Sequence, residues 1–267
     1  MLHHGWDNSF KRRITIKPGE TVEFETLDAS SGQLSPTSTA ADLTKLDLGR
    51  VNPVTGPVFV DGAQPGDALK VTLLSFKPSG WGWTGNIPGF GLLAVAPAAS
   101  GLHSIIPPRN VGGNMDVRDI AEGIELWLPV EIVGALFSVG DTHAAQGDGV
   151  VCGIESPFDV ALKFDLVKGA NLRMPRYVTP GPVTSHFDKK GYEVTTGIGP
   201  ALMQGARMAV GEMIDLLGRR FGYSPIDAYM LCSVCADLRI SSIVDVPKLG
   251  RLDVFSTDRP GVEPAPL

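Results

Sequence analysis

Two proline-glycine turns, each placed between short runs of alternating apolar residues, constrain this chain most. One turn, Lys-Pro-Gly-Glu at 17–20, interrupts an alternating run that extends from residue 13 to residue 24. The other, Gln-Pro-Gly-Asp at 64–67, separates the apolar runs at 57–62 and 68–74. A two-residue period with a proline-glycine turn predicts β-strands, joined either as β-hairpins or as β-arches. Much of the fold should therefore be β-sheet.

The composition agrees with a β-rich globular fold. The chain has 32 glycines and 21 prolines among 267 residues, which excludes a helical bundle or a coiled coil. With 43% hydrophobic and 19% charged residues it can bury a large core. The length allows one large β-rich domain with a small helical addition.

The apolar period changes from two to between three and four only after residue 199. We expect an amphipathic helix from there to about residue 220, with its apolar positions at Leu202, Ala206, Val210, Met213, Ile214 and Leu217. Ser224 followed by Pro225 predicts the start of a second helix of about ten residues. The expected architecture is a single domain, mainly β, with a β-sandwich over about 1–170 and an α/β portion over about 171–267.

Charge and cysteine content narrow the partners and the compartment. With 23 basic and 29 acidic residues, a net charge of −6 and no long run of like charge, a nucleic-acid or anionic-membrane surface is excluded. No apolar stretch is long enough for a signal peptide or a membrane span. The three cysteines, Cys152, Cys232 and Cys235, are too few for a disulfide framework, and Cys232 and Cys235 are expected in a core rather than at a metal. We therefore expect a cytoplasmic protein.

The glycine-rich segment 140–149 (GDTHAAQGDG) holds the densest group of reactive side chains. Asp141 and His143 are two residues apart, so on an extended segment both point to the same side, and an oxygen with an imidazole nitrogen suits zinc. The alternative is a solvated turn. Glu155 precedes a Ser-Pro turn that could direct its carboxyl inward as a general acid/base, although an exposed edge strand would also carry such a residue.

A second glycine-rich loop, 77–91, contains Trp81, Trp83 and Phe90. Such aromatic side chains could form the apolar wall of a small pocket, or they could fill the space between two sheets. The sequence alone leaves both interpretations open.

Several motifs, in order from about residue 15 to residue 245, resemble those of the acetamidase/formamidase family. They are NPVTGPV at 52–58, GAQPGD at 62–67, IPGFGLL at 87–93, GNMD at 113–116, LWLPV at 126–130, the loop 140–149, and DLRIS at 237–241. The resemblance implies a jelly-roll-like β-sandwich with an added α/β portion. It also implies hydrolysis of short amides such as formamide and acetamide to ammonia and a carboxylic acid, with a divalent metal at the site.

The resemblance also suggests roles for individual residues. Asp141, His143 and Asp28 would hold the metal, which is zinc or, as an alternative, calcium. Glu155 would be the acid/base beside Asp141 and His143, and the small amide would contact Trp83, Phe90 and Gln146. Similar proteins form dimers, so a homodimer is expected. One position departs from the family pattern, because Val150 stands where an acidic residue commonly follows the Gly-Asp-Gly of the loop.

Two other functions stay open at this point. The missing acid at Val150 is compatible with a catalytically reduced sandwich that binds a small polar ligand or serves as a structural subunit. An amidase with a cysteine nucleophile is the other, and Cys152 is the plausible nucleophile for it.

Overall fold

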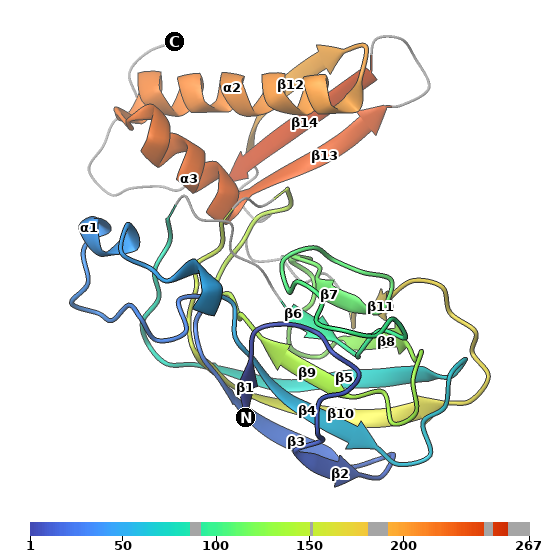
Figure 1. The fold of residues 1–267 in the computed structure, drawn as a ribbon. Helices are drawn as coiled ribbons and strands as arrows, with labels where there is room; N and C mark the ends of the chain where they lie inside the picture. The colour runs from blue at the N-terminus through green and yellow to red at the C-terminus, as the bar shows by residue number, and fades with distance from the viewer. Residues whose placement is uncertain (86–91, 150–151, 181–191, 243–247, 256–267) are drawn as a thin grey trace. The chain divides into compact units, whose positions relative to one another are not determined.

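Both proline-glycine turns carry the chain from one sheet to another (Figure 1). Strand β2 (Ile14–Ile16) pairs with β4 (Val54–Val60), whereas β3 (Thr21–Thr26), across the first turn, pairs with β10 (Phe158–Val167). The second turn joins β4 to β5 (Ala68–Pro78), which also lies in the sheet of β10. The turns are therefore β-arches, the second of the two possibilities that the sequence left open.

The computed structural model describes residues 1–85, 92–149, 152–180, 192–242 and 248–255. It divides into two compact units. The first comprises residues 1–85, 89–144 and 154–183, and the second comprises 86–88, 145–153 and 184–267. The single domain with a boundary near residue 170 stays a prediction, to which the structure adds that segment 145–153 clusters with the C-terminal residues.

The first unit is a sandwich of two sheets. One sheet has the order β1-β4-β9-β6-β7 with β2 also on β4, and the other has the order β11-β8-β5-β10-β3. The remaining strands are β1 (Leu2–His3), β6 (Leu92–Ala94), β7 (Gly112–Asn114), β8 (Glu125–Pro129), β9 (Phe137–Gly140) and β11 (Arg176–Val178). The loop between β3 and β4 contains the short helix α1 (Ala40–Leu43) and a 3-10 turn at Leu48–Arg50. The predicted mainly β sandwich is confirmed.

Three phenylalanines from both sheets meet in the core of the sandwich. Phe137 and Phe164 pack edge to face with ring centroids 5.0 Å apart, and Phe24 packs against both at 6.1 and 6.3 Å. All three are buried, together with the apolar residues of β4, β5, β8 and β10 that face inward. This core holds the strand ends rigidly, and the candidate site is built on those ends.

The second unit packs two helices with a three-stranded antiparallel sheet of order β12-β14-β13. Its elements are β12 (Tyr192–Gly199), α2 (Leu202–Phe221), α3 (Pro225–Cys235), β13 (Ala236–Ser242) and β14 (Lys248–Phe255). Ser224 accepts a hydrogen bond from the Asp227 amide at 3.2 Å, so the predicted cap of α3 is confirmed. Burial raises the pKa of Cys232 to about 12 and that of Cys235 to about 11, as expected of core thiols.

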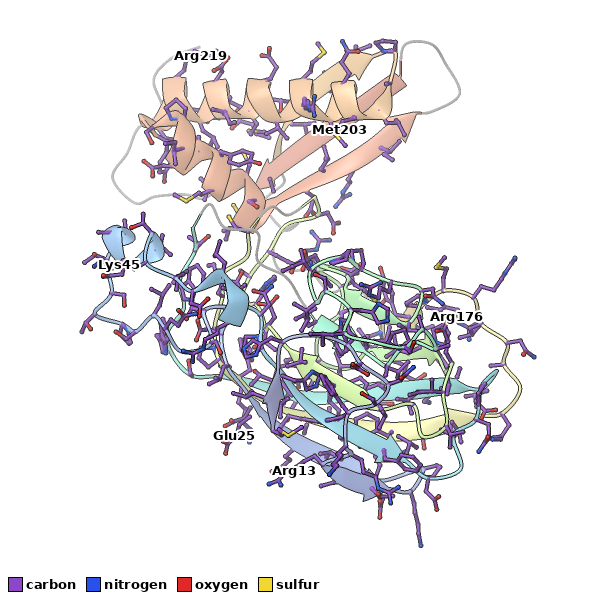
Figure 2. The ribbon with its side chains drawn as sticks, viewed as in Figure 1. Arg13, Glu25, Lys45, Arg176, Met203 and Arg219 are labelled. Atoms are coloured by element: carbon purple, nitrogen blue, oxygen red, sulfur yellow. The ribbon has the colours of Figure 1, made fainter. Side chains whose placement is uncertain are left out.

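The structure differs from the sequence prediction on the buried face of α2. Met213 and Leu217 are buried as predicted, and Val210 and Ile214 pack against the same core, but the other buried positions are Gly205 and Ala209, and Leu202 is 39% exposed. Met203 and Arg219, labelled in Figure 2, are exposed. The reason is a close approach of strand and helix, because a Cβ on Gly197 would collide with the carbonyl oxygen of Gly205. Small residues therefore face the sheet.

Strand β10 begins only at Phe158. Glu155, just before it, instead makes isolated bridges to Trp83 and His143, which shapes the candidate site. No helix in the described ranges is both long enough and apolar enough to cross a membrane.

Candidate active site

Strand β9 ends at a point where only glycine fits. Gly140 is paired with Val54 of β4, and a Cβ on it would lie 2.9 Å from the Val54 Cα and would collide with the Pro53 carbonyl. The next residue, Asp141, has a left-handed backbone, with φ of 51°, and is completely buried. The close pairing of β4 and β9 thus places the Asp141 carboxyl in the interior, at the edge of the sandwich core.

Glu155 lies between two backbone segments. On one side it forms an antiparallel bridge with His143, flanked by the hydrogen bonds Ala144 N to Ile154 O at 2.8 Å and Ser156 N to Thr142 O at 3.1 Å. On the other side, its N–H and C=O bond those of Trp83 at 2.8 and 2.9 Å. The segments at Trp83 and at residues 142–144 therefore fix the backbone of Glu155 from both sides.

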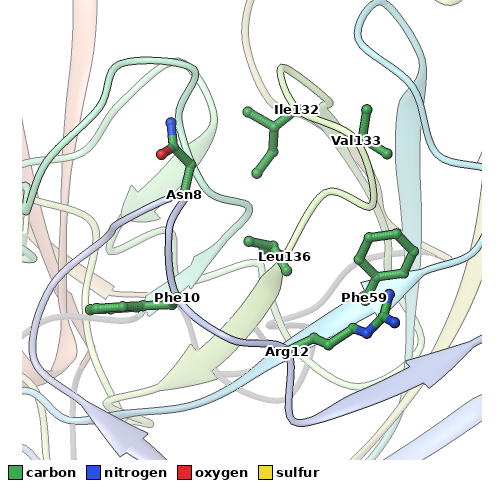
Figure 3. Close-up of a pocket in the computed structure, with 7 residues that line it drawn as sticks. All are labelled: Asn8, Phe10, Arg12, Phe59, Ile132, Val133 and Leu136. Carbon is green, nitrogen blue, oxygen red and sulfur yellow. The ribbon is translucent and has the colours of Figure 1, made fainter.

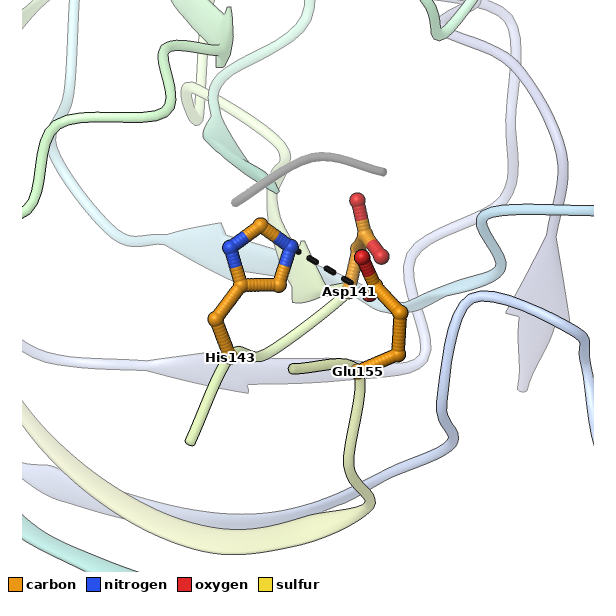
Figure 4. A group of neighbouring side chains, drawn as sticks. All are labelled: Asp141, His143 and Glu155. Atoms are coloured by element: carbon orange, nitrogen blue, oxygen red, sulfur yellow. Dashed lines mark ion pairs between the residues drawn. The ribbon is translucent and has the colours of Figure 1, made fainter. Parts of the chain in front are cut away.

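The side chains of Asp141, His143 and Glu155 meet in one cluster (Figure 4). One potential ligand atom from each lies within 4.8 Å of the other two. His143 Nε2 is 3.2 Å from Glu155 Oε2, and the side chains of His143 and Glu155 are only 5% and 2% exposed. The pairing of Asp141 with His143 and the inward direction of Glu155 agree with the sequence predictions.

The two carboxyl groups need a positive partner. Burial raises the pKa of Asp141 well above its usual value, and the nearby charge of Glu155 raises it further. Asp141 Oδ1 and Glu155 Oε1 accept no hydrogen bond from any residue that the structure describes. A shared proton or a cation would satisfy this arrangement.

A divalent metal ion fits this cluster by its donor chemistry. Two buried carboxylate oxygens and an imidazole nitrogen are typical zinc ligands. Two ligands of a tetrahedral zinc, each about 2.0–2.1 Å from the ion, lie about 3.3 Å apart. The separation of 3.2 Å between His143 Nε2 and Glu155 Oε2 matches that distance.

Asp28, the third metal ligand predicted from the resemblance, is buried but is not a member of this cluster. Its Oδ1 accepts hydrogen bonds from Trp83 Nε1 and from the Ser30 amide, both at 2.9 Å, and its Oδ2 accepts from Gly32 N at 3.3 Å. It is close enough to Asp141 for its charge to help raise the Asp141 pKa. Asp28 therefore lies near the cluster, where it accepts the hydrogen bond of the half-buried Trp83.

The other two predicted substrate contacts are placed differently. Phe90 lies outside the described residues. Gln146 belongs to the second unit, where segment 145–153 is attached to α3 and β13. There Gly147 N donates to Ser233 O at 3.0 Å, and Cys152 N donates to Ser233 Oγ at 2.8 Å. The predicted roles of Phe90 and Gln146 stay predictions.

Sequence reasoning did not single out Asn52. This residue is 1% exposed, and its Nδ2 donates to Asp141 Oδ2 at 3.2 Å. Its place at the start of the motif 52–58 was the available signal. The charge of Asp116 also raises the Asp141 pKa.

A separate hollow of about 340 Å³ lies elsewhere on the first unit (Figure 3). Arg12 stacks on the ring of Phe59 there, with its guanidinium carbon 4.7 Å from the ring centroid. The other lining residues are Asn8, Phe10, Ile132, Val133 and Leu136. This lining includes no acid, histidine or cysteine, so it lacks the groups that hydrolysis needs.

Comparisons with known proteins identify the family. Residues 1–96 and 93–255 match the profile of the Acetamidase/Formamidase family. A formamidase of Methylophilus methylotrophus is 24% identical over 92% of this chain and 86% of its own. A gamma lactamase from Delftia acidovorans superposes with a TM-score of 0.83 at 25% identity, covering 96% of this chain and 90% of that one. An acetamidase from Bacillus halodurans gives 0.62 at 29% identity, covering 95% of each chain. The chain therefore belongs to the acetamidase/formamidase family of amide hydrolases.

Proposed function

We propose that this protein hydrolyses a short aliphatic amide, similar to formamide or acetamide, to ammonia and a carboxylate in a metal-dependent reaction. The observation that carries this proposal is the buried cluster of Asp141, His143 and Glu155. The likeness to a formamidase and an acetamidase supports the substrate class.

In this proposal Asp141, His143 and Glu155 hold the ion. The nitrogen of His143 favours zinc over calcium, because calcium sites are built from oxygen ligands. Glu155 replaces Asp28 as the third ligand, since Asp28 already accepts three hydrogen bonds from Trp83, Ser30 and Gly32. Asp28 instead keeps Trp83 in place beside Glu155.

Amide hydrolysis needs an activated water, stabilisation of the oxyanion and a proton for the leaving ammonia. A bound divalent ion supplies a Lewis acid that polarises the carbonyl and lowers the pKa of water. Glu155 would help Asp141 and His143 to hold the ion, and its carboxylate would take the proton from water and pass it to the leaving nitrogen. Trp83, with Phe90 and Gln146 as further contacts, limits the space for the acyl group.

The test combines metal content with product formation. Purified wild-type protein should contain about one zinc per chain and release ammonia from formamide or acetamide, and a chelator should abolish this activity until zinc is added back. His143→Ala should lose both the metal and the activity. His103→Ala is the matched control, because His103 contacts the Ala99 carbonyl, and it should retain both.

Other results would change the proposal in defined ways. Zinc bound without ammonia release from any amide would favour the binding or structural role suggested by Val150. A lactam should be included among the compounds assayed, since one similar structure is a gamma lactamase.

Glu155→Gln should lower both zinc content and turnover. Full zinc content without turnover would make Glu155 a proton carrier alone. Loss of turnover in Cys152→Ala with zinc retained would favour the cysteine nucleophile.

A homodimer and a cytoplasmic location complete the proposal. Light scattering of the purified protein tests the first, and fractionation of the source cells tests the second.

A further inference from the structure

Asn52 stands where the chain enters β4 beside the metal cluster. Its side chain and backbone are buried, and its φ of 53° is left-handed. Its N–H donates to the Ala29 carbonyl at 2.8 Å, which ties it to the residue that follows Asp28. Asparagine and glycine adopt this backbone conformation more readily than other residues. The backbone of Asn52 is therefore fixed independently of what its side chain does.

The side chain of Asn52 acts on one oxygen of Asp141. Nδ2 donates to Asp141 Oδ2 at 3.2 Å, while the other oxygen, Oδ1, accepts no hydrogen bond within the described part of the chain. The pairing of Val54 with Gly140 brings the two residues together from neighbouring strands. The amide thus occupies one side of the carboxylate and leaves the other side for the cluster.

We infer that Asn52 is a positioning residue that orients the Asp141 carboxylate for metal binding. This inference rests on the proposed function. Hydrogen bonds to ligating carboxylates fix their orientation, and loss of such a partner typically weakens metal binding about 10- to 100-fold. The amide is well suited to the task because it donates to Asp141 without adding another negative charge beside those of Asp28 and Asp116, which lie near enough to raise the Asp141 pKa.

The experiment measures the zinc affinity of metal-free protein against a competing chelator. Asn52→Gly removes the amide but tolerates the left-handed backbone, so it should fold and bind zinc about 10- to 100-fold more weakly than wild type. Asn52→Ala should show the same weakening with a lower melting temperature, because alanine adds backbone strain. Asn171→Gly is the matched control, since Asn171 has φ of 49° and its Nδ2 and N–H donate to Gly169 O and Gly66 O, away from the cluster. It should keep wild-type affinity.

The visible spectrum of the cobalt(II)-loaded protein provides a second readout, and it should change in Asn52→Gly but not in Asn171→Gly. Wild-type zinc affinity and an unchanged cobalt spectrum in Asn52→Gly would overturn the positioning role while leaving the proposed function intact. Absence of zinc binding by the wild-type protein would overturn the proposed function itself, and the inference with it.

Discussion

Asp67 shows how a single buried carboxylate secures the turn between the two sheets. Its Oδ2 accepts hydrogen bonds from Gln64 N at 2.8 Å and Lys168 Nζ at 2.6 Å, and its Oδ1 accepts from Gly169 N at 2.9 Å. Burial acts to raise the pKa of Asp67, but the bonds from Lys168, Gly169 and Gln64 outweigh it, and the pKa lies below its usual value. The charged form of Asp67 therefore stabilises the fold.

Asp67→Asn should destabilise the protein by about 1.5–3 kcal/mol at pH 7, because the hydrogen bonds to a charged group are lost. The folded-state pKa is depressed, so the contribution is complete above the unfolded-state pKa of about 4 and is lost as the pH falls through the folded-state value. Urea unfolding of wild type and variant should therefore give free energies that converge in acid.

Asp61→Asn is the control for this change. Asp61 is exposed in the same arch, and its substitution should alter the free energy of unfolding by less than about 0.5 kcal/mol at any of these pH values. A difference between wild type and Asp67→Asn that stays constant down to acid pH would contradict the assigned role of the charge.

At this same scale, the sequence predicts Asp141, His143 and Glu155 well, because two of them are close in sequence and all three lie in or near one glycine-rich loop. It could not predict that Asp28 lies outside the cluster. That outcome depends on the indole N–H of Trp83, 55 positions further along the chain. The hydrogen bond from Asn52 to Asp141 was not predictable either, since the two residues are 89 positions apart.

Two glycine-to-alanine substitutions, one in helix α2 and one in strand β12, test how these elements pack. Gly211 lies in the middle of α2 and is exposed, and no atom lies within 4 Å of a Cβ placed there. Gly211→Ala should therefore stabilise the second unit by about 0.5–1 kcal/mol, because alanine loses less backbone entropy in a helix. Thermal unfolding followed by circular dichroism measures the change.

Gly197→Ala should have the opposite effect, because its Cβ would collide with the Gly205 carbonyl and approach Ala209 N at 2.5 Å. We expect a loss of about 1–3 kcal/mol from overpacking. If Gly197→Ala were neutral, the close approach of β12 and α2 would be wrong.

The elements themselves were largely predictable. Both helices follow from the change of period and from the Ser-Pro start of α3, and the strands from the two-residue alternation. Met213 and Leu217 on the buried face of α2 were predictable in this way. Gly205 and Ala209, opposite Gly197, were not, because amphipathicity identifies large apolar residues. Likewise, a proline-glycine turn has the same sequence whether it closes a hairpin or an arch.

For the whole molecule, metal removal should lower stability. Zinc at about 100 times its dissociation constant stabilises the folded state by about 2.7 kcal/mol, which raises the melting temperature by about 5–10 °C for a chain of this size. Differential scanning fluorimetry of metal-free protein with and without zinc measures the shift. His143→Ala should show no shift; an equal shift in that variant would place the zinc elsewhere, for example at Cys232 and Cys235.

The two arches also determine when the protein can begin to fold on the ribosome. Strand β3, residues 21–26, pairs only with β10, residues 158–167, among the strands described. At about 5–20 residues per second, its partner is made roughly 7–30 s after β3. During that interval β3 has no partner, so the nascent chain depends on chaperones or on Glu23 and Glu25 within the strand to avoid aggregation.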